Sequence, residues 1–454
     1  MVKNDAYEDE VSDNNGMNPE ACLNTTLLSA RNTWYKSVSA CSLCGRCAPR
    51  CVIYERDGDG AKGQSFAARA GLKMLDALQG DATLEGVRSH VWELIQNDEE
   101  VYQFVRRCCL CNHCTAYCPS GLRAPDTVKP WRRLFLLTGV LGNADKSIMV
   151  DNEWNIFSVY RAVFGIAYPQ FQDLASAKPG QADTVFFPGC SLVSYAPDVV
   201  CAVGEWFDTN GYRWALCTDC CGSPLISAGL AERSLALRQR ILQQCLDAGV
   251  KRVVCVCAGC AEELEAVFRG RVQVLQLPQL LCDDGTGHGL AAAGSSANGP
   301  DTVKLPDADT VTYAIHDSCH DRAQASGSPL RHMLQDAGAR LVELEHSCRN
   351  TTCCGAGGAV PAYDPALSKE RAEGIMLSAQ EAGADVLITS CPTCSYTMAQ
   401  YALDANDASP FKRVGCKHYL ELMFGIDIDW PQVFANLQDM WTGEYGAWVY
   451  EQLT

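Results

Sequence analysis

The chain has 454 residues, 47% of them hydrophobic and 20% charged, so it is long enough for about three globular domains and wholesale disorder is excluded. Its net charge of −17 argues against nucleic acid and anionic membrane surfaces as partners, because both attract Lys and Arg. No apolar run is long enough to cross a bilayer, and the acidic first residues are no signal peptide, so we expect a cytoplasmic protein. The anomaly is the number of cysteines, 27 in a chain without an export signal.

Residues 1–30 are expected to form an acidic, flexible arm, and residues 31–150 a domain that holds two metal clusters. Two motifs of the same spacing lie in this domain, Cys41-x2-Cys44-x2-Cys47-x3-Cys51 and Cys108-x2-Cys111-x2-Cys114-x3-Cys118. Such runs are typical of two cubane [4Fe–4S] clusters, with the fourth cysteine of each run on the other cluster. Crossed ligation gives the sets Cys41, Cys44, Cys47, Cys118 and Cys108, Cys111, Cys114, Cys51. Zinc is disfavoured, because zinc ligands come in pairs separated by a longer gap.

The segment between the two motifs, residues 52–107, contains apolar residues at steps of three and four. This period predicts helices over residues 65–80 and 84–107, which would separate the two cluster loops. The arrangement resembles the α-helical ferredoxin of iron–sulfur subunits in respiratory complexes.

Beyond this domain, residues 151–182 are expected to be a connector with a helix that packs between domains. An internal repeat follows, with one copy at residues 183–283 and the other at 310–427, joined by a flexible linker at 284–309. In each copy, β-rich runs alternate with amphipathic helices, which predicts a small parallel sheet with cluster ligands at the carboxyl ends of its strands. The aromatic tail, residues 428–454, is expected to dock on its own chain or on another subunit.

Each copy of the repeat carries five cysteines in the order C…CCG…CxxC. The first copy contributes Cys190, Cys220, Cys221, Cys257 and Cys260. The second copy contributes Cys319, Cys353, Cys354, Cys391 and Cys394. This pattern resembles the CCG domain, and two copies behind a double ferredoxin resemble the catalytic subunit of heterodisulfide reductase in its fused form. The resemblance covers residues 35–425 and extends to iron–sulfur subunits of glycolate, lactate and glycerol-3-phosphate oxidation.

The resemblance implies an α/β fold of two pseudo-symmetric CCG halves behind an N-terminal α-helical ferredoxin domain. It also implies that each five-cysteine set holds a noncubane [4Fe–4S] cluster, in addition to the two cubanes. The family's HDPCH-like stretch reads His316-Asp317-Ser318-Cys319-His320 here, with Ser318 in place of proline. The histidine that precedes the last helix of each half is present as His418, whereas the first copy has Gln276 at that place.

His316 and His320 flank a proposed cluster ligand. Either they deliver protons to a departing thiolate, or they hydrogen-bond the cluster or the backbone and only tune its potential. His418 is interpreted as structural. Nine cysteines fall outside the motifs and are interpreted mainly as small buried hydrophobic residues: Cys22, Cys109, Cys201, Cys217, Cys245, Cys255, Cys282, Cys348 and Cys416. Among them, Cys109 is interpreted as a bystander in a ligand loop, and Cys217 as the best candidate for an exchanged ligand.

Three functions remain open. One is a thiol–disulfide oxidoreductase that works by one-electron steps at the noncubane clusters. Another is an electron-transfer module that docks a protein thiol or trisulfide. The remaining one is an electron-relay subunit of a quinone-linked hydroxy-acid dehydrogenase, a class in which one set of cysteines is often incomplete. Because both sets are complete here, disulfide chemistry is favoured. No flavin or haem motif is visible, so we expect a flavoprotein or a membrane b-type cytochrome as electron partner. A membrane partner would attach the chain to the inner face of the membrane.

Overall fold

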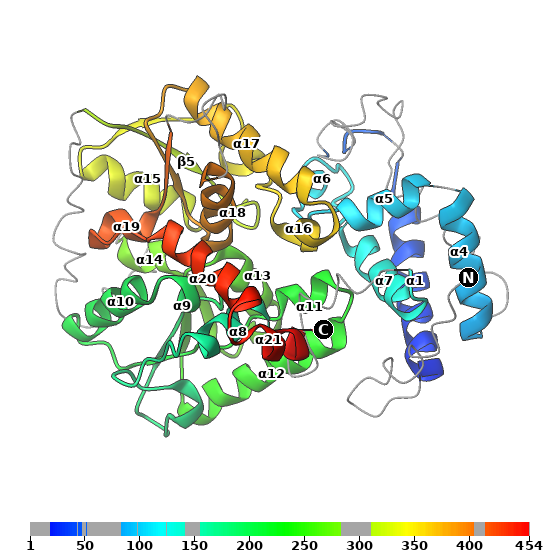
Figure 1. The fold of residues 1–454 in the computed structure, drawn as a ribbon, viewed down its shortest axis with the longest axis horizontal. Helices are drawn as coiled ribbons and strands as arrows, with labels where there is room; N and C mark the ends of the chain where they lie inside the picture. The colour runs from blue at the N-terminus through cyan, green and yellow to red at the C-terminus, as the bar shows by residue number, and fades with distance from the viewer. Residues whose placement is uncertain are drawn as a thin grey trace.

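The computed structural model describes residues 19–42, 44–47, 51, 83–97, 99–123, 125–140, 155–282, 310–403 and 414–453. A helical N-terminal region lies beside two α/β halves, as Figure 1 shows. The predicted linker at 284–309, the helix predicted at 65–80 and the first 18 residues of the predicted arm lie outside the described residues. Among the described residues, no helix is long and apolar enough to cross a membrane.

The N-terminal region, residues 19–140, is built from helices α1 (Pro19–Ala40), α4 (Leu84–Asn97), α5 (Glu99–Arg107), α6 (His113–Ala116) and α7 (Pro125–Leu137). The helices predicted over 84–107 are therefore present as α4 and α5. Helix α1 begins at Pro19, which corrects the predicted arm, because residues 19–30 are helical. Leu23 and Leu27, one turn apart, are buried from this segment in the same core as Trp131 and Phe135 of α7. That apolar face makes the segment part of the domain.

The two α/β halves contain parallel four-stranded sheets of the same topology. The first sheet has the order β2-β1-β3-β4, and the second has the order β6-β5-β7-β8. The strands are β1 (Thr184–Phe187), β2 (Trp214–Leu216), β3 (Arg252–Cys255), β4 (Gln273–Gln276), β5 (Thr312–His316), β6 (Arg340–Val342), β7 (Val386–Thr389) and β8 (Gly415–His418). All pairings are parallel, for example Val185 with Val253 and Ala314 with Leu387. The predicted α/β class, with a helical N-terminal region and two matching halves, is confirmed.

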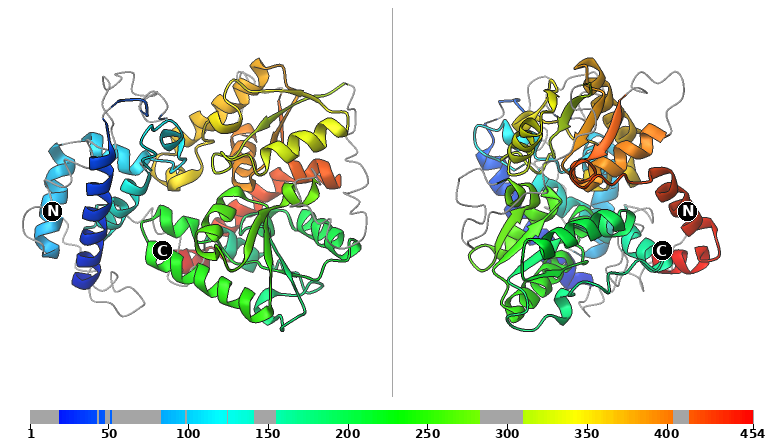
Figure 2. Two further views of the ribbon diagram at one scale, coloured as in Figure 1. Left: turned by 180° about the vertical axis from the view of Figure 1, so that it is seen from behind. Right: turned by 90° about the vertical axis from the view of Figure 1, so that its left-hand side faces the viewer.

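Helices cover both sheets, as the two views in Figure 2 show. Those of the first half are η3 (Leu174–Ser176), α9 (Leu192–Tyr195), α10 (Pro197–Thr209), α11 (Ser223–Ser227), α12 (Ala231–Ala248), α13 (Ala258–Phe268) and α14 (Leu277–Leu281). Those of the second half are α15 (Gly327–Asp336), η4 (Cys348–Asn350), η5 (Gly357–Ala359), α16 (Val360–Tyr363), α17 (Pro365–Glu381), α18 (Pro392–Leu403) and α19 (Tyr419–Phe424). The halves share an apolar core that includes Phe186 from the first sheet and Ile388 from the second. They therefore form one packed unit.

The connector and the tail pack on each other and on the halves. Connector helix α8 (Ile156–Val163) lies against α9, and tail helices α20 (Trp430–Thr442) and α21 (Gly446–Leu453) lie against α8. The Asn436 amide donates a hydrogen bond of 2.9 Å to the Tyr160 hydroxyl, and Trp430 is buried in the shared core. Of the two dockings expected for the tail, the structure shows the one on its own chain.

Candidate metal centres

The cysteines of each half lie where strands of its sheet end. In the first half, Cys190 follows β1 and Cys257 follows β3; in the second, Cys319 follows β5 and Cys391 follows β7. Because the strands are parallel, their carboxyl ends share one edge of the sheet, and the loops beyond them meet there. The loops after β1 and β3 thereby meet at one edge of the first sheet, and the loops after β5 and β7 meet at one edge of the second sheet.

The first set of cysteines forms a continuous row of sulfur atoms. Cys220 contacts Cys190 and Cys221, Cys221 contacts Cys260, and Cys260 contacts Cys257. The double cysteine is followed by Gly222 with φ 78°, and a Cβ at that position would collide with Ser234. The Gly222 N–H donates to Cys220 Sγ at 3.4 Å. Only glycine allows this tight turn, which directs two consecutive thiols into one site.

The second set repeats this arrangement. Cys353 contacts Cys319 and Cys354, Cys354 Sγ lies 3.2 Å from Cys394 Sγ, and Cys394 contacts Cys391. Gly355 has φ 87°, would clash with the Ser368 backbone if it carried a Cβ, and donates its N–H to Cys353 Sγ at 3.4 Å. The five residues named for each half in the sequence are thus assembled in the same order twice.

The two sets meet at the boundary between the halves. Cys257 Sγ of the first set and Cys391 Sγ of the second lie 3.9 Å apart, and both side chains are buried. The hydroxyl of Tyr195 crosses the same boundary and donates to the Pro392 carbonyl at 2.7 Å. A single line of ten sulfur atoms therefore runs through the centre of the α/β unit.

The charge states of these thiols follow from their packing. Hydrogen bonds from four neighbouring thiols hold the pKa of Cys353 well below its usual range, and bonds from Cys257 and Cys394 do the same for the pKa of Cys391. In contrast, hydrogen bonding to Cys190 and Cys221, together with burial, raises the pKa of Cys220. In the first set, hydrogen bonds from Cys220 and Cys260 hold the pKa of Cys221 well below its usual range. The first set thus favours a thiolate at one position and the second set at two, and the thiolate is the form that binds metal.

The donor chemistry of both sets fits an iron–sulfur cluster. Each set offers five soft sulfur atoms in a buried site, with a backbone N–H directed at one sulfur. Among the described residues, no group of three or more His, Cys, Asp or Glu side chains surrounds a point suited to one metal ion. An extended row of sulfurs suits a group of several irons rather than a single ion.

The two cysteine motifs of the N-terminal domain also approach each other. Burial raises the pKa of the Cys114 thiol, and the charges of Cys108, Cys51 and Cys47 add to the rise. Cys47 and Cys51 of the first motif therefore both lie near the second motif. Cys44 is exposed, whereas Cys41, Cys47 and Cys118 are half-buried, so this end of the domain faces solvent.

The N-terminal domain meets the second half through its second motif. Cys353 contacts both Cys109 and Cys111, and all three belong to one apolar cluster. Gly358 packs so closely on the backbone of Cys108 and Cys109 that a Cβ would collide with it. Cys109, interpreted from sequence as a bystander, thus contacts a candidate ligand of another centre.

Arg132 of α7, which the sequence did not single out, joins three parts of the molecule. Its guanidinium is fully buried and donates to the carbonyls of Val105 at 2.9 Å and Cys108 at 2.7 Å in its own domain. It also donates to Ser227 of the first half at 2.8 Å and to Gly358 of the second at 2.5 Å. All of these acceptors are neutral main-chain carbonyls. Burial raises the pKa of Cys108, and the positive charge of Arg132 opposes that rise.

The two histidines of the HDSCH stretch have different surroundings. His316 is buried, burial lowers its pKa, and neither ring nitrogen has a hydrogen-bond partner among the described residues. His320 Nδ1 lies 2.6 Å from Glu262 Oε2, and although burial opposes it, this contact raises the pKa of His320. Glu262 also lies 3.4 Å from Arg123 of the N-terminal domain. Glu262 is a further residue that sequence reasoning missed.

His418 and Gln276 occupy corresponding positions, as their place in the repeat indicated. Each ends the last strand of its sheet and forms the N-terminal capping box of the next helix, with Glu421 and Gln279 respectively. Of the remaining cysteines, Cys245 and Cys217 are buried in the apolar core of the first half. Cys22 lies in α1.

Comparison with known proteins agrees with this division of the chain. The model of the cysteine-rich domain CCG matches residues 184–265 and 313–399, and that of the 4Fe-4S dicluster domain matches residues 37–122. A subunit of dihydromethanophenazine:CoB–CoM heterodisulfide reductase from Methanosarcina barkeri is 27% identical over 396 residues, which cover 82% of this chain and 90% of the relative. The corresponding protein from Methanosarcina mazei is 26% identical over 79% of this chain and 87% of its own.

A more distant relative, an uncharacterized iron–sulfur protein of Methanocaldococcus jannaschii, is 24% identical over 65% of this chain and 57% of its own. The chain therefore contains one dicluster domain and two CCG domains, and iron–sulfur clusters are the cofactors that such domains carry. The helical N-terminal region is accordingly named the dicluster domain, and the two halves are named the first and second CCG copies.

Proposed function

Because the chain belongs to the heterodisulfide-reductase-like iron–sulfur proteins, which join a dicluster domain to two CCG domains, we propose that it is a thiol–disulfide oxidoreductase subunit. The cysteine motifs pointed to this family, and the matches confirm it. The related subunits act, by their name, on the CoB–CoM heterodisulfide, which makes a disulfide of two small thiols the class of substrate proposed here.

One observation carries the proposal. Both five-cysteine sets are complete, and they meet at the 3.9 Å contact between Cys257 and Cys391. Reduction of a disulfide takes two electrons and two protons and yields two thiols, so two adjacent one-electron centres match the chemistry. When bound, two noncubane clusters would supply the electrons and a binding place for each sulfur. In electron-relay subunits of this kind, one of the two sets is often incomplete.

The chain's own residues have separate roles in this proposal. The two CCG sets are the proposed cluster ligands at the reaction site, and the two motifs of the dicluster domain, Cys41 to Cys51 and Cys108 to Cys118, are the proposed ligands of two cubanes that conduct electrons. His320 follows Cys319 in the chain, but its ring is held by Glu262 at 2.6 Å and lies beside Gly259, between Cys257 and Cys260; it is proposed as a proton donor. His316 has no hydrogen-bond partner among the described residues and is proposed only to tune the reduction potential of the cluster.

The electron partner is proposed to be another subunit. The relatives are subunits of a larger reductase, and a flavoprotein or a b-type cytochrome would supply electrons to the dicluster domain. The alternative function is that of an electron-relay iron–sulfur subunit of a quinone-linked hydroxy-acid dehydrogenase or of a membrane redox complex.

The decisive test separates the two kinds of centre. We expect about sixteen irons per chain, as four [4Fe–4S] clusters require, in anaerobically purified protein; eight irons or stoichiometric zinc would refute the cluster assignment. Cys354→Ser should abolish turnover of a disulfide while the cubane signals in electron paramagnetic resonance persist. Cys111→Ser should instead block electron supply from a partner, with partial recovery by a small direct reductant.

The relay function makes the opposite prediction for ligand binding. If candidate thiols leave the spectrum of the CCG centres unchanged in oxidised protein, while a quinone-linked partner still receives electrons, the chain is a relay. A spectral change on thiol addition that is lost in Cys354→Ser supports the reductase.

A further inference from the structure

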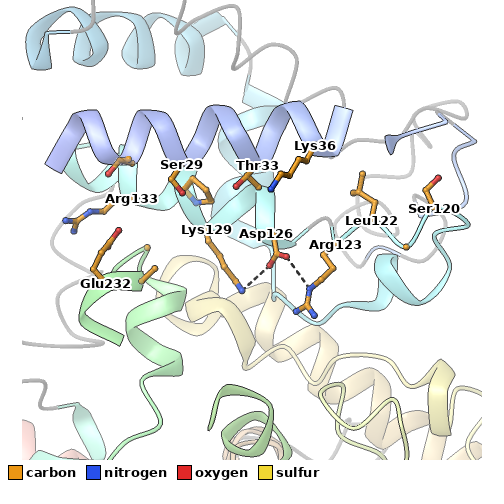
Figure 3. A pocket seen from close by; sticks show the side chains of 15 residues that line it. Ser29, Thr33, Lys36, Ser120, Leu122, Arg123, Asp126, Lys129, Arg133 and Glu232 are labelled. Atoms are coloured by element: carbon orange, nitrogen blue, oxygen red, sulfur yellow. Dashed lines mark hydrogen bonds and ion pairs between the residues drawn. The ribbon is translucent and has the colours of Figure 1, made fainter. Parts of the chain in front are cut away.

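A pocket lies where the dicluster domain meets the first CCG copy, as Figure 3 shows. Helices α1 and α7 form one wall, and the turn between α11 and α12 forms the other. Its volume is about 560 Å³, large enough for several side chains of a partner or for a small molecule. It is separate from both sets of CCG cysteines, and nothing in the proposed function uses it.

The charge of this pocket is opposite to that of the chain. Four basic and two acidic side chains line it: Lys36, Arg123, Lys129, Arg133, Asp126 and Glu232. The whole chain, in contrast, has 37 basic and 54 acidic residues. Asp126 is engaged on both sides, by Lys129 Nζ at 3.2 Å and Arg123 Nε at 3.2 Å, and Arg123 also lies 3.4 Å from Glu262 outside the lining. The basic side chains of the lining still outnumber these three carboxylates. A positive patch on an acidic protein attracts an anionic partner to one place and repels it elsewhere.

The pocket also lies beside a candidate cluster ligand. Ser120, Gly121, Leu122 and Arg123 of its wall follow Cys118 closely in the chain, and the Leu122 N–H donates to Cys118 Sγ at 3.3 Å. Cys118 is only half-buried, and Cys44 of the other motif is exposed, whereas nine of the ten CCG cysteines are buried. Electrons that enter from solvent therefore reach the dicluster domain first. The pocket wall at Leu122 is in direct contact with Cys118 of that domain.

We propose that this pocket is the docking site for the carboxylate side chains of an acidic electron-carrier protein, which exchanges electrons with the cluster next to Cys118. The proposal rests on the proposed function in one respect, because it takes the dicluster domain to be the entrance for electrons. It adds which face of that domain the partner covers and which charge the partner presents.

The test uses the anaerobic holoprotein and a reduced bacterial two-cluster ferredoxin as the acidic carrier. Stopped-flow absorbance would follow the second-order rate of electron transfer at low and high ionic strength. For the unchanged protein we expect the rate to fall as salt is added, because attraction between opposite charges is screened. Lys36→Glu should lower the rate at low salt by about tenfold, and Lys36→Arg should retain it.

Lys251→Glu is the matched control. Lys251 is also exposed, but it lies at the amino end of β3, opposite the edge with the cysteines, so the same change of charge should leave the rate unaltered. A rate for Lys36→Glu equal to that of the unchanged protein, or equal losses for Lys36→Glu and Lys251→Glu, would overturn the proposal. So would a rate that rises when salt is added to the unchanged protein.

Failure of the proposed function would look different. The viologen radical cation is a small reductant that needs no cationic dock, so it should reduce the clusters of Lys36→Glu at a rate no lower than that of the unchanged protein. If disulfide turnover driven by this reductant is absent in all variants, the reductase function fails and the docking result stands by itself.

Discussion

Replacement of Arg132 tests whether one buried cation holds the dicluster domain against both CCG copies. Arg132→Met would leave the carbonyls of Val105, Cys108, Ser227 and Gly358 without their charged donor in a buried interface. A hydrogen bond to a charged group contributes about 1.5–3 kcal/mol, and an unsatisfied buried acceptor costs about 1–3 kcal/mol. The relief from no longer burying the charge offsets part of this loss, so we expect a net loss of about 3 kcal/mol.

The assay is hydrogen–deuterium exchange of the holoprotein, which reports local opening without assuming two-state unfolding of a multidomain chain. A loss of about 3 kcal/mol corresponds to opening that is roughly a hundredfold more frequent. The faster exchange should be confined to segments around residues 104–110, 225–230 and 356–360. Arg132→Lys, which keeps the charge but reaches fewer carbonyls, should show a smaller increase in exchange.

The same variants separate charge from geometry. Removal of the positive charge beside Cys108 should lower the reduction potential of the cubane nearest that residue, whereas Arg132→Lys should shift it less. If Arg132→Met protein exchanged at the unchanged rate at all three segments, the account of Arg132 as the joint between domains would be refuted.

Three further outcomes are expected. Cys109→Ala should shift the redox potential or the spectrum of the centre in the second CCG copy, with iron content unaltered, because the thiol that contacts a sulfur of that centre is lost; an unchanged redox titration would contradict this. Burial raises the pKa of Glu421 from 4.5 to about 7, so folding favours its protonated form. The free energy of unfolding should therefore be highest below pH 4.5 and fall by about 3 kcal/mol as the pH rises to above 7. Urea midpoints at pH 5 and 8 should differ less for Glu421→Gln than for the unchanged protein. Arg331→Met should cost about 3–5 kcal/mol and loosen the Cys319 loop, because it leaves buried Asp317 without its partner at 2.7 Å, whereas Glu343→Gln on the exposed side of the same guanidinium should cost under about 1 kcal/mol in the same urea titration.

The parts of the structure that could be predicted are those with local sequence signals. A β-rich run before each CxxC pair, repeated in two copies, was enough to predict parallel strands with cysteines at their carboxyl ends. The repeat also identified Gln276 and His418 as equivalent positions, and both cap a helix after the last strand. These features depend on residue types at fixed spacing, which a single sequence records.

The contacts between domains left no such signal. Arg132 binds main-chain carbonyls at positions 105, 227 and 358, and a carbonyl acceptor is the same for every residue type. Cys109 could not be told from a buried hydrophobic residue, because its contact with Cys353 joins segments more than 240 positions apart. The start of α1 at Pro19 was missed because the acidic residues before it dominated the composition of the segment.

The packing of the dicluster domain against Cys353 has a consequence for biosynthesis. The turn that carries Cys109 and Cys111 lies against this cysteine, with Gly358 pressed onto its backbone, so the dicluster domain closes one side of the second CCG copy. A scaffold protein that delivers a preformed cluster needs access to the cysteines it loads. We therefore expect a cluster to enter the second copy before the dicluster domain closes over it.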